Sequence, residues 1–155
     1  MLPVTDNIPL AVAYRLTGVA FSMSAKQLKK SLKLDGDGRP TELKAIPLYF
    51  LASHSAELFL KAALLKRGFN ELDLKKYDFR HNLNSLLIEL QNKGVFVTDE
   101  TVKTINGLSE QHKKNALRYT ILLDDGNETF WPPLFLVFSM LEELLGLTAI
   151  STQGN

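Results

Sequence analysis

Cysteine is absent from the 155-residue sequence, which excludes disulfide bonds and metal sites built on thiolates. Long hydrophobic runs are lacking as well, because the longest, from Pro132 to Leu141, is too short to span a bilayer. No basic stretch precedes the apolar residues near the N-terminus, and Arg15 soon interrupts them, so the sequence predicts no signal peptide. We therefore expect a cytoplasmic protein that does not associate with a membrane.

Several familiar binding and catalytic motifs are also missing. The sequence has neither a Walker loop nor the glycine pattern of dinucleotide-binding folds, and no serine lies in a nucleophile-elbow pattern. The three histidines, His54, His81 and His112, lie far apart in the chain and form no recognisable zinc motif. From the sequence we therefore expect no cofactor and no bound metal.

The composition that remains is typical of a globular protein. Hydrophobic residues make up 45% of the chain and charged residues 23%, so a disordered chain is not expected. A length of 155 residues corresponds to about one domain. We expect a single helical domain over residues 1–150, followed by a frayed tail over residues 151–155.

The charge is distributed unevenly, although the net charge is only +1. Residues 1–118 contain all 18 basic residues and 12 of the 17 acidic residues, so this part carries a net charge of +6. Residues 119–155 contain acidic residues and no Lys or Arg. This asymmetry is compatible with an acidic ligand, such as RNA, bound by the early helices.

Apolar residues recur at helical spacing along most of the chain, whereas short extended segments are predicted only at residues 95–97 and 119–123. Glycine and proline separate the helical segments, and residues 70–81 form a polar connection. The predicted fold class is all-α, an up-and-down bundle of four to five helices. The predicted helices cover residues 9–34, 41–67 or 45–67, 82–92, 99–116 and 132–146.

The second predicted helix is apolar nearly all round, but it carries a narrow polar stripe. His54, Glu57 and Lys61 lie within about 60° of one another at about 100° per residue. A charged side chain that faces a packed interior is costly unless it is paired, and a Glu beside a His can orient the imidazole. The stripe is therefore part of a functional site, a polar network that fixes helix packing, or a stripe that meets solvent.

Arg80, His81 and Asn82 directly precede the third predicted helix. Basic groups at this position could bind a phosphate together with the free N–H groups of the helix N-terminus. The alternative is plain capping, in which Asn82 accepts hydrogen bonds from those N–H groups and His81 packs nearby.

A basic and aromatic cluster lies at the end of the fourth predicted helix. Phosphate contacts combined with base stacking on the aromatic ring would suit single-stranded RNA. The alternative is a solvated helix end, at which cations interact favourably with the helix dipole. The cluster consists of His112, Lys113, Lys114, Arg118 and Tyr119.

Residues 54–65, with Gly68 as the helix stop, resemble the second helix of HEPN domains, on which a His or Ala, a Glu and a Lys recur along an apolar helix. Residues 80–83 are similar to the His-Asp-Leu helix start of that family, with Asn82 in place of the Asp. Arg118 and Tyr119 resemble the Arg-Tyr pair that often follows its fourth helix. These matches occur in order over about half of the chain.

The resemblance implies a helical bundle that is commonly homodimeric. Active HEPN domains are metal-independent RNA nucleases, often toxins or defence effectors, and some pair with a small nucleotidyltransferase. Their signature is an Arg followed four to six residues later by a His. That signature is missing here, because His81 follows Arg80 immediately and His112 precedes Arg118.

Our main hypothesis is a HEPN-like homodimer that binds RNA or a nucleotide without the standard catalytic pair, in a prokaryotic defence or toxin–antitoxin setting. A nucleotidyltransferase-type protein is the candidate partner that the resemblance implies. The candidate binding residues are Lys61, Arg80, His81, Lys114, Arg118 and Tyr119.

Two alternatives remain open. The first is a divergent, metal-independent ribonuclease, in which His81 or His54 is the general base and Arg80 or Arg118 stabilises the charge on the phosphorane. Its candidate catalytic residues are His54, Glu57, His81 and Arg118. The second is a non-enzymatic interaction module that buries a partner or a second copy of the chain against Trp131, Phe135, Phe138 and Leu145.

Overall fold

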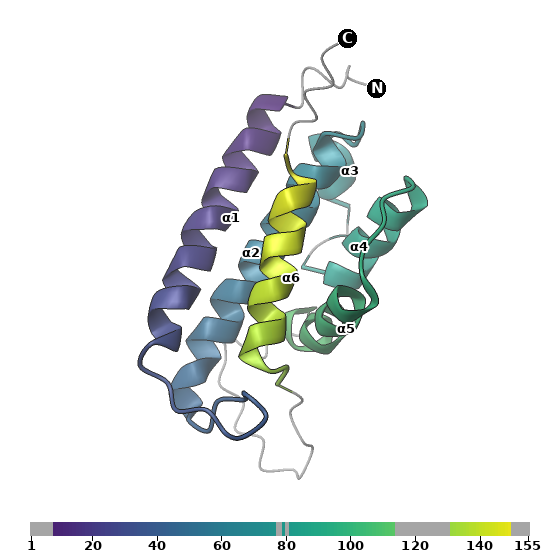
Figure 1. The fold of residues 1–155 in the computed structure, drawn as a ribbon. Coiled ribbons are helices and arrows are strands. Elements are labelled where there is room, and N and C mark those ends of the chain that lie inside the picture. The colour runs from purple at the N-terminus through teal and green to yellow at the C-terminus, as the bar shows by residue number, and fades with distance from the viewer. Residues whose placement is uncertain (1–7, 77–78, 80, 114–130, 150–155) are drawn as a thin grey trace.

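The computed structural model describes residues 8–76, 79, 81–113 and 131–149. Every regular element within these residues is a helix, and no strand occurs among them, so the predicted all-α class is confirmed for this part of the chain (Figure 1). The elements are α1 (Ile8–Lys29), the 3-10 helix η2 (Leu43–Ala45), α2 (Ile46–Leu65), α3 (Glu71–Leu74), α4 (Leu83–Asn92), α5 (Asp99–Lys113) and α6 (Leu134–Leu147).

Four of the five predicted helices match the observed ones closely, and the differences lie at their ends. The sequence predicts a first helix that reaches residue 34, but α1 ends at Lys29. The chain turns after this residue, and Leu34 forms an isolated bridge with Pro40. The short helix α3 lies inside the predicted polar connection, where Asn70 and Asp73 form a reciprocal capping box. The tail over residues 151–155 and the candidate strand over residues 119–123 lie outside the described residues.

Helix α2 is the centre of the structure, because it contacts α1, α4, α5 and α6 (Figure 1). Of its 20 residues, 14 are buried, as its nearly continuous apolar surface predicts. In the described part of the chain, the stretch Leu43–Leu65 is long and apolar enough to cross a membrane, but 78% of its most apolar window is buried inside the structure. Core helices of soluble proteins share these properties.

The most extensive packing between two helices is that of α1 against α2, which lie side by side in Figure 1. The two helices approach closely at Gly18, whose carbonyl oxygen accepts a hydrogen bond of 2.7 Å from the buried Ser55 hydroxyl. The ring of the buried Phe59 packs directly against the same glycine. On the other side of α1, Leu16 and Met23 are exposed, so part of its apolar surface is not covered by the described residues.

The start of α6 is held by a residue of α2, Tyr49, and by Arg39 of the segment between α1 and α2. The Tyr49 hydroxyl donates a buried hydrogen bond of 2.6 Å to the carbonyl oxygen of Pro132, and Arg39 donates one of 2.9 Å to that of Trp131. Because these bonds fix the start of α6, Trp131 packs against the ring of Tyr49. Of the residues assigned to a partner surface, only Phe135 is exposed, whereas the others pack in part against the core.

Basic side chains from α1 and the end of α2 hold the C-terminal end of α6. Arg67 donates a hydrogen bond of 3.2 Å to the carbonyl oxygen of Leu147, and Lys66 donates one to that of Thr148. Arg15 donates a bond of 3.1 Å to the Thr148 hydroxyl. Cations at this position stabilise a helix by interacting with its free carbonyl groups and its dipole. Helices α1, α2 and α6 are therefore tied together at this end.

We expect the substitution Gly18→Ala to destabilise the protein. An added Cβ would lie 2.7 Å from Cε1 of Phe59, and this ring is buried and cannot move aside easily. Overpacking of this kind costs about 1–3 kcal/mol, which exceeds the gain of about 1 kcal/mol from helix propensity. Urea unfolding followed by circular dichroism measures the difference.

Gly146→Ala is the matched control, because an added Cβ at this position on α6 would meet no atom within 4 Å. Here the propensity gain remains, and the free energy of unfolding should stay unchanged or rise by up to about 1 kcal/mol. Equal effects of the two substitutions would contradict the close approach of α1 and α2 at Gly18.

Candidate functional site

The candidate site is built around Glu57, a carboxylate that is only 1% exposed in the middle of α2. His54 and Lys61 stand three residues before it and four residues after it, so the helix places all three on one face. Two histidines from other elements complete the arrangement: His81 precedes α4, and His112 lies near the end of α5. We call these five residues the Glu57 cluster.

Both oxygens of the carboxylate have basic neighbours. The Lys61 ammonium donates a hydrogen bond of 2.8 Å to Oε1, and Nε2 of His112 lies 2.9 Å from Oε2. Nδ1 of His81 lies 3.2 Å from Oε1 and 3.3 Å from Oε2. Nδ1 of His54 lies 3.6 Å from Oε2, which is too long for a hydrogen bond. The Glu57 cluster thus gathers one carboxylate, one ammonium and three imidazoles.

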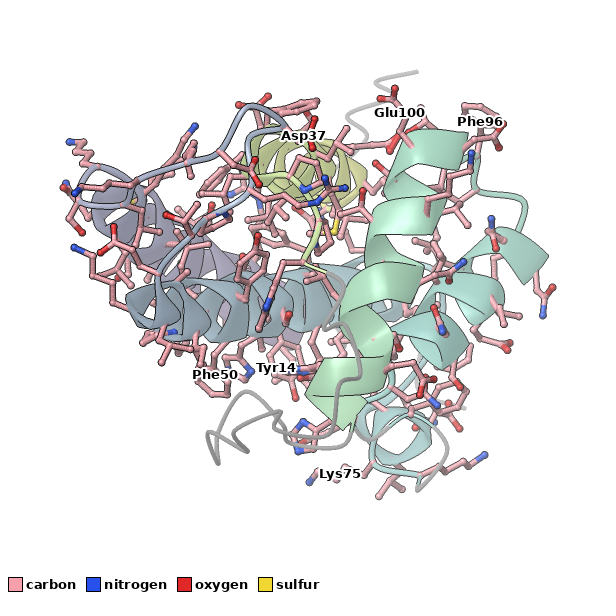
Figure 2. All side chains as sticks on the ribbon, turned by 90° about the horizontal axis from the view of Figure 1, so that it is seen from below. Tyr14, Asp37, Phe50, Lys75, Phe96 and Glu100 are labelled. Carbon is pink, nitrogen blue, oxygen red and sulfur yellow. The ribbon has the colours of Figure 1, made fainter. Side chains whose placement is uncertain are left out.

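The position of His112 follows from the way α5 crosses α2. Figure 2 shows α5 running across α2, with Glu100 at one end of α5. His112 lies near the end of α5 opposite Glu100 and continues the buried stripe of Ile105 and Leu108 at helical spacing. Its side chain is therefore buried against Glu57 instead of reaching solvent.

His81 reaches Glu57 through an unusual backbone conformation. Its φ is 53°, in the left-handed region, which is uncommon for a residue other than glycine. Asn82 comes next and caps α4, because its side chain accepts a hydrogen bond of 3.1 Å from the backbone N–H of Ser85. A backbone held in this region stores strain and occurs often at functional sites.

Aromatic rings fix the orientation of His54. Phe21 of α1 meets the imidazole edge to face, with the ring centroids 4.6 Å apart. Phe50, one turn earlier on α2, lies parallel to it with the centroids 6.2 Å apart. His54 is therefore held by packing, and its Nδ1 is buried without a hydrogen-bond partner among the described residues.

Burial of the Glu57 carboxyl would raise its pKa, because a charge is poorly solvated in the interior. The imidazoles of His112 and His54 and the ammonium of Lys61 act in the opposite direction and outweigh burial. The pKa of Glu57 is therefore lowered well below its ordinary value, and the residue is a carboxylate at neutral pH. The cluster depends on this negative charge.

Four of the residues predicted from the sequence meet in this cluster: His54, Glu57, Lys61 and His81. Arg80, Lys114, Arg118 and Tyr119, which were also predicted, lie outside the described residues. The convergence of the first four excludes the interpretation of the α2 stripe as one that simply meets solvent, because Glu57 is buried.

The interpretation of His112 as part of a solvated helix end is wrong, because its side chain is buried against Glu57. The sequence does contain the signal that was missed. His112 stands four residues after Leu108 and seven after Ile105, which places it on the core side of its helix.

The three histidines, dispersed along the sequence, are gathered around one carboxylate in space. Each of His54, Glu57 and His112 offers one possible metal-ligand atom, and these three atoms lie within 4.8 Å of one another. At this spacing they could hold a metal ion. The side chains of Lys61, His54 and His81 are 17%, 25% and 36% exposed, so one edge of the cluster is accessible from outside.

Comparison with known proteins adds nothing to this geometry: no protein-family model matches the chain, and neither a curated protein nor a solved structure matches it.

We expect Glu57→Gln to lower the free energy of unfolding at pH 7 by about 3 kcal/mol, since it leaves Lys61 without its buried counter-ion. The lowered pKa also predicts a pH dependence. The carboxylate's stabilisation is fully present above its unfolded-state pKa of about 4.3 and is lost as the pH falls below that value. Wild-type stability should therefore fall on acidification more steeply than that of the variant.

Chemical unfolding between pH 7 and pH 3, with EDTA present, measures both effects. Glu142→Gln is the control, because this glutamate of α6 is exposed. The free energy of unfolding of this variant should stay close to that of the wild type. Parallel pH profiles for the wild type and Glu57→Gln would show that the charge of Glu57 is not what holds the cluster.

Proposed function

We propose that this chain is a HEPN-like domain, an up-and-down bundle of four to five helices, that forms a homodimer and binds RNA or a nucleotide. The observation that carries the proposal is the convergence of the His-x-x-Glu-x-x-x-Lys stripe of α2 with His81, which precedes α4. These are the segments on which the resemblance to HEPN domains rests, and 24 positions separate Glu57 from His81 in the sequence. Because the α2 stripe and His81 meet at the Glu57 carboxylate, one polar centre explains why both segments carry these polar residues.

A phosphate is the group that the accessible edge of the cluster would bind. Lys61 and His81 are both partly exposed, and each can donate hydrogen bonds to phosphate oxygens. Glu57 holds both side chains in place, so little rotamer freedom would be lost on binding. The net charge of +6 over the first 118 residues adds long-range attraction for a polyanion. By the same resemblance, the setting is prokaryotic defence or a toxin–antitoxin pair in the cytoplasm, with a nucleotidyltransferase-type partner.

We expect the wild-type protein to bind labelled single-stranded RNA or a nucleoside phosphate at low salt, and to bind more weakly as salt is raised. His81→Ala should weaken binding at least about tenfold, because a directly placed donor to phosphate is lost. Fluorescence anisotropy measures the affinity, and light scattering after size-exclusion chromatography tests for the dimer.

Lys103→Ala is the control for non-specific charge effects, because this lysine of α5 is exposed. It should reduce affinity much less than His81→Ala does. If neither RNA nor a nucleotide binds at low salt, the proposal is wrong, whatever the oligomeric state.

A metal-independent ribonuclease is the second candidate, and one specific observation favours it. Nδ1 of His81 lies within hydrogen-bond distance of the Glu57 carboxylate, and the ring is partly exposed. A carboxylate at Nδ1 holds the proton there and leaves Nε2 free to accept one, as in hydrolase triads. Nε2 would remove the proton of a ribose 2′-OH, whose oxygen then attacks the adjacent phosphorus and releases the 5′-oxygen of the next nucleotide.

This candidate predicts cleavage of labelled single-stranded RNA in the presence of EDTA. His81→Ala should reduce the rate at least about a hundredfold, the contribution typical of a general base. His54→Ala should have a smaller effect, because His54 does not hydrogen-bond to Glu57 in this arrangement. Intact RNA with the wild-type protein would leave binding as the function, and unchanged cleavage with His81→Ala would exclude His81 as the base.

A further inference from the structure

One nitrogen in the Glu57 cluster is buried and makes no hydrogen bond within the described residues. Nδ1 of His54 is buried and has no hydrogen-bond partner among the described residues, although Phe21 and Phe50 hold its ring in place. A buried polar atom left without a partner costs free energy, so its presence in an ordered side chain requires a reason.

The cluster also has more basic groups than are needed to neutralise Glu57. Lys61 alone balances the charge of Glu57, with a hydrogen bond of 2.8 Å to Oε1. The three imidazoles around the carboxylate are therefore more donors than charge neutralisation requires. Two of them, His54 and His112, lie on the side of Oε2, whereas Lys61 lies at Oε1.

We propose that His54, Glu57 and His112 form a binding site for a divalent transition metal of the zinc class. The ligand atoms are Nδ1 of His54, Oε2 of Glu57 and Nε2 of His112, which lie within 4.8 Å of one another. Two imidazoles and one carboxylate are a ligand set that suits zinc, and sites of this composition leave a fourth position for water or a substrate atom.

The two distances from Oε2 of Glu57 to the histidine ligand atoms are close to those of a zinc site. In a tetrahedral zinc site with bonds of 2.0–2.1 Å, neighbouring ligand atoms lie about 3.3 Å apart. Oε2 of Glu57 lies 2.9 Å from Nε2 of His112 and 3.6 Å from Nδ1 of His54, one slightly below this value and one slightly above it. A metal ion would also satisfy Nδ1 of His54, the atom that lacks a partner.

The remaining residues of the cluster have the positions expected of a second shell. Lys61 and His81 both lie within 3.2 Å of Oε1, the oxygen that does not face His112, and would hold the ligating carboxylate in orientation. The carboxylate also separates the Lys61 ammonium from the proposed ion. His54 and Glu57 stand at i and i+3 on one helix, a spacing that recurs in metal sites inside helical bundles.

This site goes beyond the proposed binding of RNA or nucleotides and does not depend on it. Isothermal titration of tag-free, chelator-treated protein with Zn²⁺ at neutral pH tests it without any nucleic acid. We expect one ion per chain for the wild type. His54→Ala should remove saturable binding, and His81→Ala should retain the same stoichiometry with an affinity lowered about tenfold, as for a residue that only supports a ligand.

His81→Ala is the matched control, because it removes a histidine from the same cluster but not from the proposed ligand set. Circular dichroism shows whether each variant keeps its helix content. Titration of the wild type with Co²⁺ gives a second readout that needs no variant, because tetrahedral cobalt has an intense visible absorption. Absence of both Zn²⁺ binding and this absorption would overturn the proposal, as would wild-type Zn²⁺ affinity in a folded His54→Ala protein.

Discussion

A carboxylate in the interior of a helical protein is stable only if the surrounding structure replaces the water that it has lost. At Glu57 that replacement comes from four side chains on three parts of the chain: α2 itself, the residue before the cap of α4, and the end of α5. The apolar packing of α2 against its neighbours supplies most of the burial energy but little directional information. The Glu57 cluster fixes the relative orientation of these helices, because its hydrogen bonds form only when α4 and α5 pack on α2 in one relative position.

The same requirement explains two local features that packing alone does not. His81 adopts a left-handed backbone conformation, which is unfavourable for a side chain with a Cβ, yet this brings its ring to the carboxylate just before Asn82 starts α4. His112 is buried at the end of a helix that is otherwise polar toward that end, and its partner there is again Glu57. In both cases a local cost is offset by a hydrogen bond to a charged group in a medium of low dielectric constant.

Much of the fold could be predicted from the sequence, because helix periodicity and capping residues act over short distances. Asn82 and Gly94 mark the limits of α4, and the polar stripe of α2 is visible from residue spacing alone. The partners of that stripe could not be predicted in the same way. His81 and His112 lie 24 and 55 positions from Glu57, and which helices meet is decided by the packing of the whole chain.

His112 shows the physical reason for the misinterpretation most clearly. Its neighbours in sequence are Lys113 and Lys114, and a run of basic residues at a helix end is usually solvated. The position on the helix, in line with Ile105 and Leu108, was the stronger signal, because a helix buries one face whatever the composition of its end. A polar residue on the apolar face of one helix therefore predicts a polar partner on another.

The arrangement also constrains how the two proposals relate to each other. Oε1 of Glu57 faces Lys61 and Oε2 faces His112, whereas His81 lies within 3.3 Å of both oxygens. A phosphate at the accessible edge would contact Lys61 and His81, whereas a metal ion would lie among His54, Oε2 and His112. Because one carboxylate orients both sets of groups, an ion at Oε2 would change the charge felt by His81 and Lys61 and so would strengthen the binding of an anion at the edge. Metal occupancy and phosphate affinity would then be coupled through Glu57, and by linkage each would favour the other to the same extent.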